Sequence, residues 1–179
     1  MFERVKEDNS DSIKKATSVL ESGGIIAYPT DTIYGFGCDA RNEKAIERLN
    51  NIKGRSAPMS VLCPSFQNVS SWIDLPSHEK AIVEKQIKPK TTLIVPVKRN
   101  VVSNLILGNG NTLGIRISNR PFCVSVAHNY SNPITTTSVN RSGHEPLSDP
   151  YKIELEFLNE IELFIDDGVI TGKGSKIYK

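Results

Sequence analysis

The sequence predicts an α/β fold with one open, twisted, mixed sheet and helices on both sides. Stretches with helical spacing of apolar residues alternate with short β-rich runs along the chain. The strongest β run, residues 91–97, is followed by the turn sequence Gly108-Asn109-Gly110 and a second run at 114–117, so we expect an antiparallel hairpin within the sheet. A length of 179 residues fits a single domain over residues 1–179 with a sizeable core.

The first part of the chain predicts two helices around a short strand. Apolar residues recur at helical spacing over residues 9–21, and Gly23-Gly24 follows as a helix stop. Residues 25–28 form a short apolar strand that runs into a polar loop, and Asn42 is placed to cap the second helix. The residues that can cap the first helix are Asn9, Ser10 and Asp11.

The rest of the chain continues this alternation. Ser77 is expected to cap a helix that runs to Ile87, and Pro121 fits the first turn of a helix that reaches about His128. The other expected elements are strands at 61–62, 134–137 and 162–165 and a helix at 151–158.

Composition and charge are those of an ordinary globular protein. The net charge is +2 and the sequence pI is about 8.4, too small a basic excess to indicate nucleic-acid binding by charge alone. The three cysteines are widely spaced, so we expect free buried thiols, no metal site, and a cytoplasmic protein. No signal peptide is visible and no apolar run approaches the roughly 20 residues that span a bilayer, so we expect no membrane association.

Two distant segments carry residues suited to a phosphate-bearing ligand. Lys53-Gly54-Arg55 offers two cations around a glycine that lets a ligand approach the backbone. The segment from Ser138 to Gly143 follows a predicted strand, is rich in hydrogen-bond donors, and has the hydroxyls of residues 135–137 beside it. Each segment has a structural alternative: cations at a helix end usually face water, and a Ser-x-Asn step is a common strand-ending turn.

The segment Pro29–Gly35 and Arg116 are candidates for recognising a small polar molecule. Thr32 would give a hydroxyl and Tyr34 an aromatic wall with a polar tip, although such a turn is as often only a connector. Arg116 alternates with two isoleucines in a predicted strand and so points to the opposite face. If that face is wet, Arg116 is an ordinary surface residue; if it is covered, Arg116 needs an anionic partner, and a ligand carboxylate would serve.

Together these segments resemble the YrdC family, the TsaC-type threonylcarbamoyl-AMP synthases, in its short single-domain form. The match extends from about Ser18 to Gly168 and rests on four motifs in fixed order. These motifs are Gly24–Gly35, Lys53-Gly54-Arg55, Gly114-Ile115-Arg116-Ile117 and Thr137–Gly143. The resemblance implies an open twisted sheet around a basic, concave hollow.

The resemblance also implies a reaction and its participants. L-Threonine, bicarbonate or CO₂, and ATP would be joined into threonylcarbamoyl-AMP with release of pyrophosphate; Mg²⁺ would accompany ATP, and no prosthetic group is expected. The product would serve threonylcarbamoyladenosine modification of tRNA next to the anticodon, through a transfer complex of the TsaD/TsaB/TsaE type, and direct contact with tRNA is left open.

Roles for individual residues follow from the same motifs. The catalytic residues, which would also bind ATP, would be Lys53, Arg55, Ser138 and Asn140. Ser142 would join them at the nucleotide. The residues on the threonine side would be Thr32, Tyr34, Arg116, Thr136 and Ser175.

The chain departs from the family pattern in three places. Lys88-Pro89-Lys90 stands where Pro-Gly-Pro is usual, Leu62-Cys63 where long-form members have a His, and Ser175-Lys176 where a Ser-Thr pair with a following Asp is usual. The last departure alters a residue near the threonine carboxylate, so activity or substrate preference could be shifted. Two alternative functions are an RNA-binding module, whose hollow contacts phosphates, and carbamoyl-adenylate chemistry of the HypF type.

Overall fold

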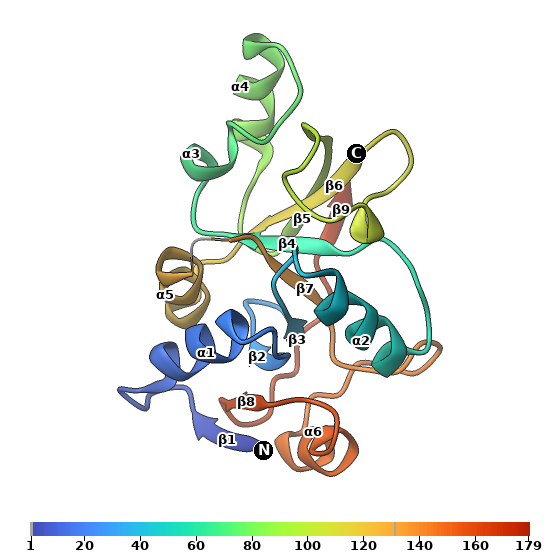
Figure 1. Ribbon diagram of the computed structural model, residues 1–179. Helices are drawn as coiled ribbons and strands as arrows, with labels where there is room; N and C mark the ends of the chain where they lie inside the picture. The colour runs from blue at the N-terminus through green and yellow to red at the C-terminus, as the bar shows by residue number, and fades with distance from the viewer. Residues whose placement is uncertain (1, 131) are drawn as a thin grey trace.

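The protein folds around one nine-stranded sheet, as seen over residues 2–130 and 132–179, which this computed structural model describes (Figure 1). The strands are β1 Glu3–Lys6, β2 Ile26–Pro29, β3 Tyr34–Gly37, β4 Ser60–Cys63, β5 Thr91–Pro96, β6 Thr112–Ile117, β7 Ile134–Ser138, β8 Leu163–Asp166 and β9 Lys176–Tyr178. Their order is β1-β8-β2-β3-β7-β4-β6-β5-β9. The pairs β1–β8, β2–β8, β4–β6 and β5–β9 are parallel and the other pairs antiparallel, which confirms the predicted mixed sheet.

Helices cover both faces of the sheet, as the sequence predicts. α1 (Ser12–Glu21) and α5 (Pro121–Asn129) pack together on one face, and α2 (Glu43–Lys53) and α6 (Pro150–Phe157) lie on the other (Figure 1). Alternate residues of β2 enter the two hydrophobic clusters, because successive side chains of a strand point to opposite faces. The shorter helical elements are α3 Phe66–Val69, α4 Ser77–Gln86 and the 3₁₀ turn η1 Asn104–Ile106.

Strand β3 lies in a segment where the sequence predicts no strand, directly after the polar loop that follows β2. It pairs with β2 and β7 and depends on two glycines for close packing. A Cβ on Gly37 would lie 2.8 Å from Tyr28 Cε1, and a Cβ on Gly35 would lie 3.3 Å from Thr136 Oγ1. Glycine is a poor strand former, so the pattern hides a strand whose glycines are required by its neighbours.

The end of α1 and the start of α2 lie where the sequence predicts them. The N–H groups of Gly23 and Gly24 donate to the carbonyls of Leu20 and Val19 at 3.0 and 2.8 Å, which confirms the predicted stop. The Asn42 cap is also confirmed, because its Oδ1 accepts the third N–H of α2 at 3.1 Å.

The capping prediction for α1 is confirmed in position only, and the one for α4 is wrong. Asp11 holds the N-cap position of α1 without a side-chain bond, and its N–H instead donates to Asn9 Oδ1 in the preceding turn. Ser77 is the first residue of α4 and follows Pro76, which has no side-chain acceptor. None of the residues of α4 is fully buried, and Val83 packs, partly buried, against the core.

The turn at Gly108-Asn109-Gly110 also has a different role from the one expected. The N–H of Gly108 donates to the carbonyl of Thr112 at 2.8 Å, and β5 and β6 are antiparallel, as predicted. The connection between them, however, is a long loop that contains η1. The glycine turn closes the end of that loop and does not form a tight hairpin.

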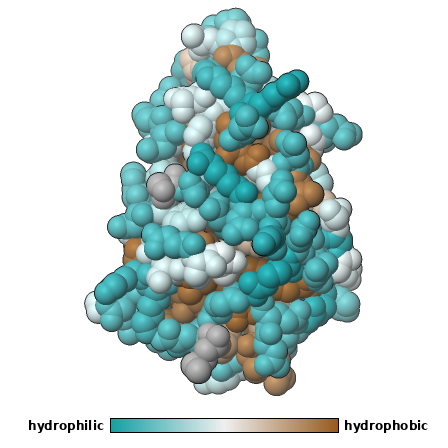
Figure 2. Space-filling view, viewed as in Figure 1, coloured by the Kyte–Doolittle hydropathy of each residue, from teal (hydrophilic) through white to brown (hydrophobic). Residues whose placement is uncertain are grey.

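The surface is mainly hydrophilic on the face shown in Figure 2, where hydrophobic residues form small separate groups. Within the described residues, the helices are all too short or too polar to cross a membrane.

Phe157 anchors α6 on the sheet, and its truncation tests this packing. Its ring is fully buried and meets Phe36 edge to face, with centroids 5.0 Å apart. We expect Phe157→Ala to lower the free energy of unfolding in urea by about 3–5 kcal/mol, the usual cost for a buried aromatic. Leu155→Ala in the same helix is the control, because Leu155 is 79% exposed; equal losses in the two variants would contradict this packing.

Candidate functional site

A hollow of about 280 Å³ is lined by residues of strands β3 to β7 and β9 and by the loops that follow β2 and α2. It brings together residues from distant parts of the chain. The sequence-predicted residues that line it are Tyr34, Arg55, Arg116, Thr136, Ser138 and Ser175. Lys53, Asn140 and Thr32 are hydrogen-bonded to residues of this lining or to their neighbours.

Lys53 is buried and joins α2 to the turn after β7. The residue is only 2% exposed, and its Nζ donates to Ser138 O at 2.6 Å, Asn140 O at 3.0 Å and Asn140 Oδ1 at 3.1 Å. Ser138 Oγ and Asn140 Oδ1 are 2.5 Å apart. The alternative of a solvated cation is therefore wrong for Lys53, which ties together the two segments singled out in the sequence.

Arg55 is the exposed cation of the hollow. Gly54 ends α2 with a left-handed φ of 66°, and this turn places Arg55 in the lining. Burial, and secondly the positive charge of Arg55, lower the pKa of Lys53 to about 8. The two cations thus differ: Lys53 is held by backbone oxygens, whereas Arg55 makes no side-chain hydrogen bond within the described part of the chain.

Arg116 lies in a covered wall, so the wet-face alternative is wrong. It is 9% exposed, and Nη2 donates to Thr32 Oγ1 at 2.9 Å and to Asp31 Oδ1 at 3.0 Å. The anionic partner that a covered Arg116 needs is Asp31 of the same chain. The sequence placed Asp31 in a polar loop and gave it no role; an acid in a loop next to a strand that carries an inward-facing arginine is the signal that indicates such a pair.

Two other predicted residues have their polar groups engaged within the protein. Tyr34 is fully buried; its hydroxyl donates to Gly168 O at 2.7 Å and accepts the N–H of Asp167 at 2.9 Å. Ser142 lies outside the lining, and its N–H donates to Lys53 O at 2.8 Å. Of the hydroxyls at the end of β7, that of Thr135 points away and bonds the N–H of Cys38 at 2.9 Å.

Residues 168–175, which we call the strap, connect β8 to β9 across the hollow. A Cβ on Gly172 would lie 1.6 Å from the carbonyl oxygen of Thr32, so the strap backbone lies directly against the β2–β3 loop. Two hydrogen bonds hold the strap. The N–H of Ile170 donates to Ser148 O at 3.1 Å, and the hydroxyls of Ser175 and Thr92 are hydrogen-bonded at 2.7 Å. It therefore forms part of the wall.

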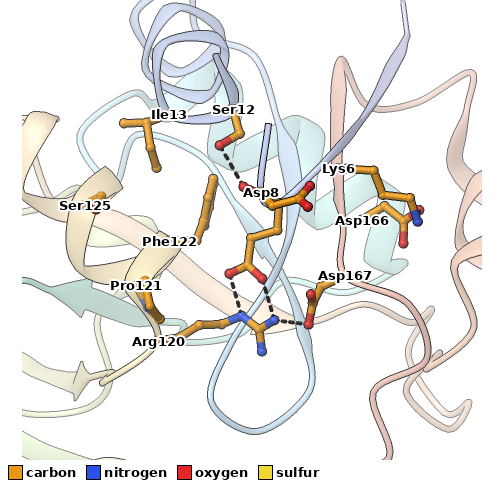
Figure 3. Close-up of a pocket in the computed structure, with 11 residues that line it drawn as sticks. Lys6, Asp8, Ser12, Ile13, Arg120, Pro121, Phe122, Ser125, Asp166 and Asp167 are labelled. Carbon is orange, nitrogen blue, oxygen red and sulfur yellow. Dashed lines mark hydrogen bonds and ion pairs between the residues drawn. The ribbon is translucent and has the colours of Figure 1, made fainter. Parts of the chain in front are cut away.

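A second hollow, of about 820 Å³, is larger, and its arginine is already paired with acidic side chains (Figure 3). Arg120 makes two bonds to the Glu7 carboxylate, at 2.8 and 2.7 Å, and pairs with Asp167. Asp166 is paired with Lys6. None of the sequence-predicted residues lines this hollow, so we place the candidate site in the smaller one.

Neither metal nor thiol chemistry is indicated. Within the described residues there is no group of three side chains suited to hold a metal ion, and the smaller hollow is lined by hydroxyls and cations without a carboxylate. The cysteines are free and buried, as predicted. Burial raises the pKa of Cys38 and of Cys123 to about 12, so these thiols stay protonated. Cys63 is also buried and lies outside the lining.

Comparison with known proteins identifies the family. A family model described as "Telomere recombination" (Sua5/YciO/YrdC) matches residues 18–179, so the chain belongs to this family. The threonylcarbamoyl-AMP synthase of Photobacterium profundum is 31% identical over 141 residues, 76% of each chain. The family resemblance seen in the sequence is thereby confirmed.

Solved structures confirm the fold. P. abyssi Sua5 complexed with L-threonine is 26% identical with a TM-score of 0.86, and the match covers 99% of this chain and 53% of that one. The present chain thus spans about half the length of that relative. Full-length HypF in its phosphate- and nucleotide-bound form is 18% identical with a TM-score of 0.80 over 93% of this chain and 26% of that one, and shares the fold.

The contact of the strap with the site can be tested at Gly172. Gly172→Ala places a Cβ where the Thr32 carbonyl lies, so the strap must move away. We expect hydrogen exchange at residues 170–176 to become at least roughly tenfold faster while global unfolding changes little. Gly174→Ala is the control, because a Cβ there meets nothing within 4 Å; unchanged exchange in Gly172→Ala would contradict the contact.

Proposed function

We propose that this protein is an L-threonylcarbamoyladenylate synthase, an ATP-using nucleotidyltransferase. The observation that carries the proposal is the presence of two different cations in one hydroxyl-rich hollow. Arg55 is exposed and suited to the phosphates of ATP, while Arg116 is buried and suited to the carboxylate of threonine. Membership of a family that includes threonylcarbamoyl-AMP synthases supports the same assignment.

The proposed reaction needs positioning and charge stabilisation rather than a covalent enzyme intermediate. The neutral threonine amine attacks the carbon of CO₂ and releases one proton, or attacks that of bicarbonate with loss of water, and either route gives a carbamate. A carbamate oxygen then attacks the α-phosphorus of ATP, and the bond to the β-phosphate breaks, so pyrophosphate leaves with the electron pair. Arg55 and Lys53 would stabilise the charge that develops on these phosphates.

The residues of the hollow divide between the two substrates in this proposal. Ser138 and Asn140 would present the nucleotide side, because Lys53 holds their turn in place. Thr32 orients Arg116 from behind, and the hydroxyls of Thr136 and Ser175 would meet threonine. An adjoining groove of about 480 Å³ shares Thr92 and other lining residues with the hollow and gives the nucleotide additional room.

Mg²⁺ would arrive with ATP as part of the substrate. Among the described residues the hollow has no carboxylate in its lining, so these side chains do not fit a resident divalent ion. The ATP phosphates would supply the oxygens that hold the metal.

The wider role of the proposed enzyme follows from its product, threonylcarbamoyl-AMP. We place the enzyme in the cytoplasm, where threonylcarbamoyl-AMP would pass to a TsaD/TsaB/TsaE-type complex for tRNA modification. An RNA-binding role is less favoured, because the hollow is small and, of its described lining residues, only Arg55 is an exposed cation. HypF-type chemistry is supported only by a shared fold.

Substitution of Arg55 tests the proposal without disturbing the core. We expect threonine-dependent release of pyrophosphate from ATP to fall by roughly tenfold or more in Arg55→Ala, because one electrostatic stabiliser is lost. Arg99→Ala is the control, since Arg99 is exposed and lies outside the hollow. Wild-type protein that releases no pyrophosphate with threonine, or equal rates in the two variants, would refute the assignment.

Loss of the charge on Lys53 should weaken ATP binding at alkaline pH, which sets an alkaline limit to the proposed reaction. Because its pKa is lowered to about 8, Lys53 is cationic below that pH and loses its charge above it. We therefore expect the KM for ATP to rise between about pH 7 and pH 9. Arg55→Ala removes a positive neighbour and should move this limit to higher pH; a limit that stays in place would show that Lys53 does not cause it.

A further inference from the structure

Arg116 and Asp31 form an ion pair that is almost completely covered. The two side chains are 11% and 2% exposed, and Nη2 of Arg116 lies 3.0 Å from Asp31 Oδ1. A buried guanidinium without an anion is strongly unfavourable. The carboxylate of Asp31 is therefore what allows a cation to be held in this wall of the hollow.

Asp31 is itself fixed by a second bond. Its Oδ2 accepts the N–H of Lys90 at 2.6 Å, where Lys90 has a positive φ of 64° just before β5. The carbonyl of Lys90 accepts the N–H of Lys176 at 3.0 Å at the start of β9. The carboxylate of Asp31 thus connects the β2–β3 loop, Arg116 of β6, and the pair of strands β5 and β9, where the strap ends.

The contacts with Asp31 and Thr32 determine which hydrogen-bond donors of Arg116 are already used. Both hydrogens of Nη2 are used, one by Asp31 and one by Thr32 Oγ1. Within residues 2–130 and 132–179, Nε and Nη1 of Arg116 have no hydrogen-bond partner, and Arg116 lines the hollow. Asp31 is outside the lining and both its oxygens are occupied, so it acts through Arg116 and not on a ligand.

We propose that Asp31 is a positioning residue that sets how well the site binds threonine. It holds the Arg116 guanidinium so that Nε and Nη1 remain for the substrate carboxylate, and it balances the charge of Arg116 while the site is empty. The inference rests on the proposed synthase function and adds to it a residue that touches neither substrate.

Asp31→Asn is the direct test. The amide keeps the shape and one acceptor but loses the charge, and its NH₂ group must face a donor of Arg116 or Lys90. We expect the KM for threonine to rise by roughly tenfold and the KM for ATP to change less than about twofold. Glu154→Gln is the matched control, because Glu154 pairs with Arg4 outside both hollows; it should leave both KM values near those of the wild type.

A double-variant cycle separates positioning from a general structural effect. If Asp31 acts through Arg116, the effect of Asp31→Asn on the threonine KM should largely vanish in an Arg116→Ala background. Equal losses in both backgrounds, or a rise in the ATP KM as large as that for threonine, would overturn the proposal.

Two checks keep the outcome clear. Thermal unfolding of each variant reports folding, and if Asp31→Asn does not fold, Asp31→Glu replaces it. The longer side chain of Asp31→Glu keeps the charge but displaces the carboxylate, so the threonine KM should still rise; an unchanged value in a folded variant would overturn the proposal.

Wild-type protein without threonine-dependent pyrophosphate release would overturn the synthase function itself, whereas an active wild type with an unaffected Asp31→Asn overturns only the role of Asp31.

Discussion

The buried ammonium of Lys53 is the interaction on which the candidate site depends. It binds Ser138 O, Asn140 O and Asn140 Oδ1, so the end of α2 and the turn after β7 are held together although they lie 85 residues or more apart in sequence. The N–H of Ser142 returns to the Lys53 carbonyl and closes the same junction. Because the left-handed turn at Gly54 follows directly, the contact that buries one cation also directs Arg55 into the hollow.

The arginines of the two hollows differ in how they are paired with acidic side chains. Arg120 is bound by Glu7 and Asp167, and one of its nitrogens also donates to Thr30 O at 3.3 Å, so it supports the site loop from behind. Among the described residues, the guanidinium of Arg116 is bound through one nitrogen, by Asp31 and Thr32. An arginine with unused donors is suited to an anion, and for this reason we propose the smaller hollow, rather than the larger one, as the place for substrates.

The sequence predicted the fold well where patterns are local, and it predicted which contiguous motifs lie together. Helices α1, α2, α5 and α6 and the mixed sheet follow from apolar spacing and turn residues. Strand β3 escaped prediction because its glycines are explained only by Tyr28 and Thr136, which lie on other strands. The segments around Lys53 and Ser138 were paired correctly, but the burial of Lys53 and the partner of Arg116 depend on contacts between residues 84 or more positions apart, which no local pattern encodes.

The central claim is that the hollow joins threonine, a one-carbon unit and ATP in one product. The most direct test is mass spectrometry of the nucleotides formed when purified protein is given L-threonine, ¹³C-bicarbonate and MgATP. The account predicts threonylcarbamoyl-AMP that carries the label in its carbamoyl carbon, formed in step with pyrophosphate. Unlabelled AMP alone, or ATP left intact by a folded protein, would contradict it.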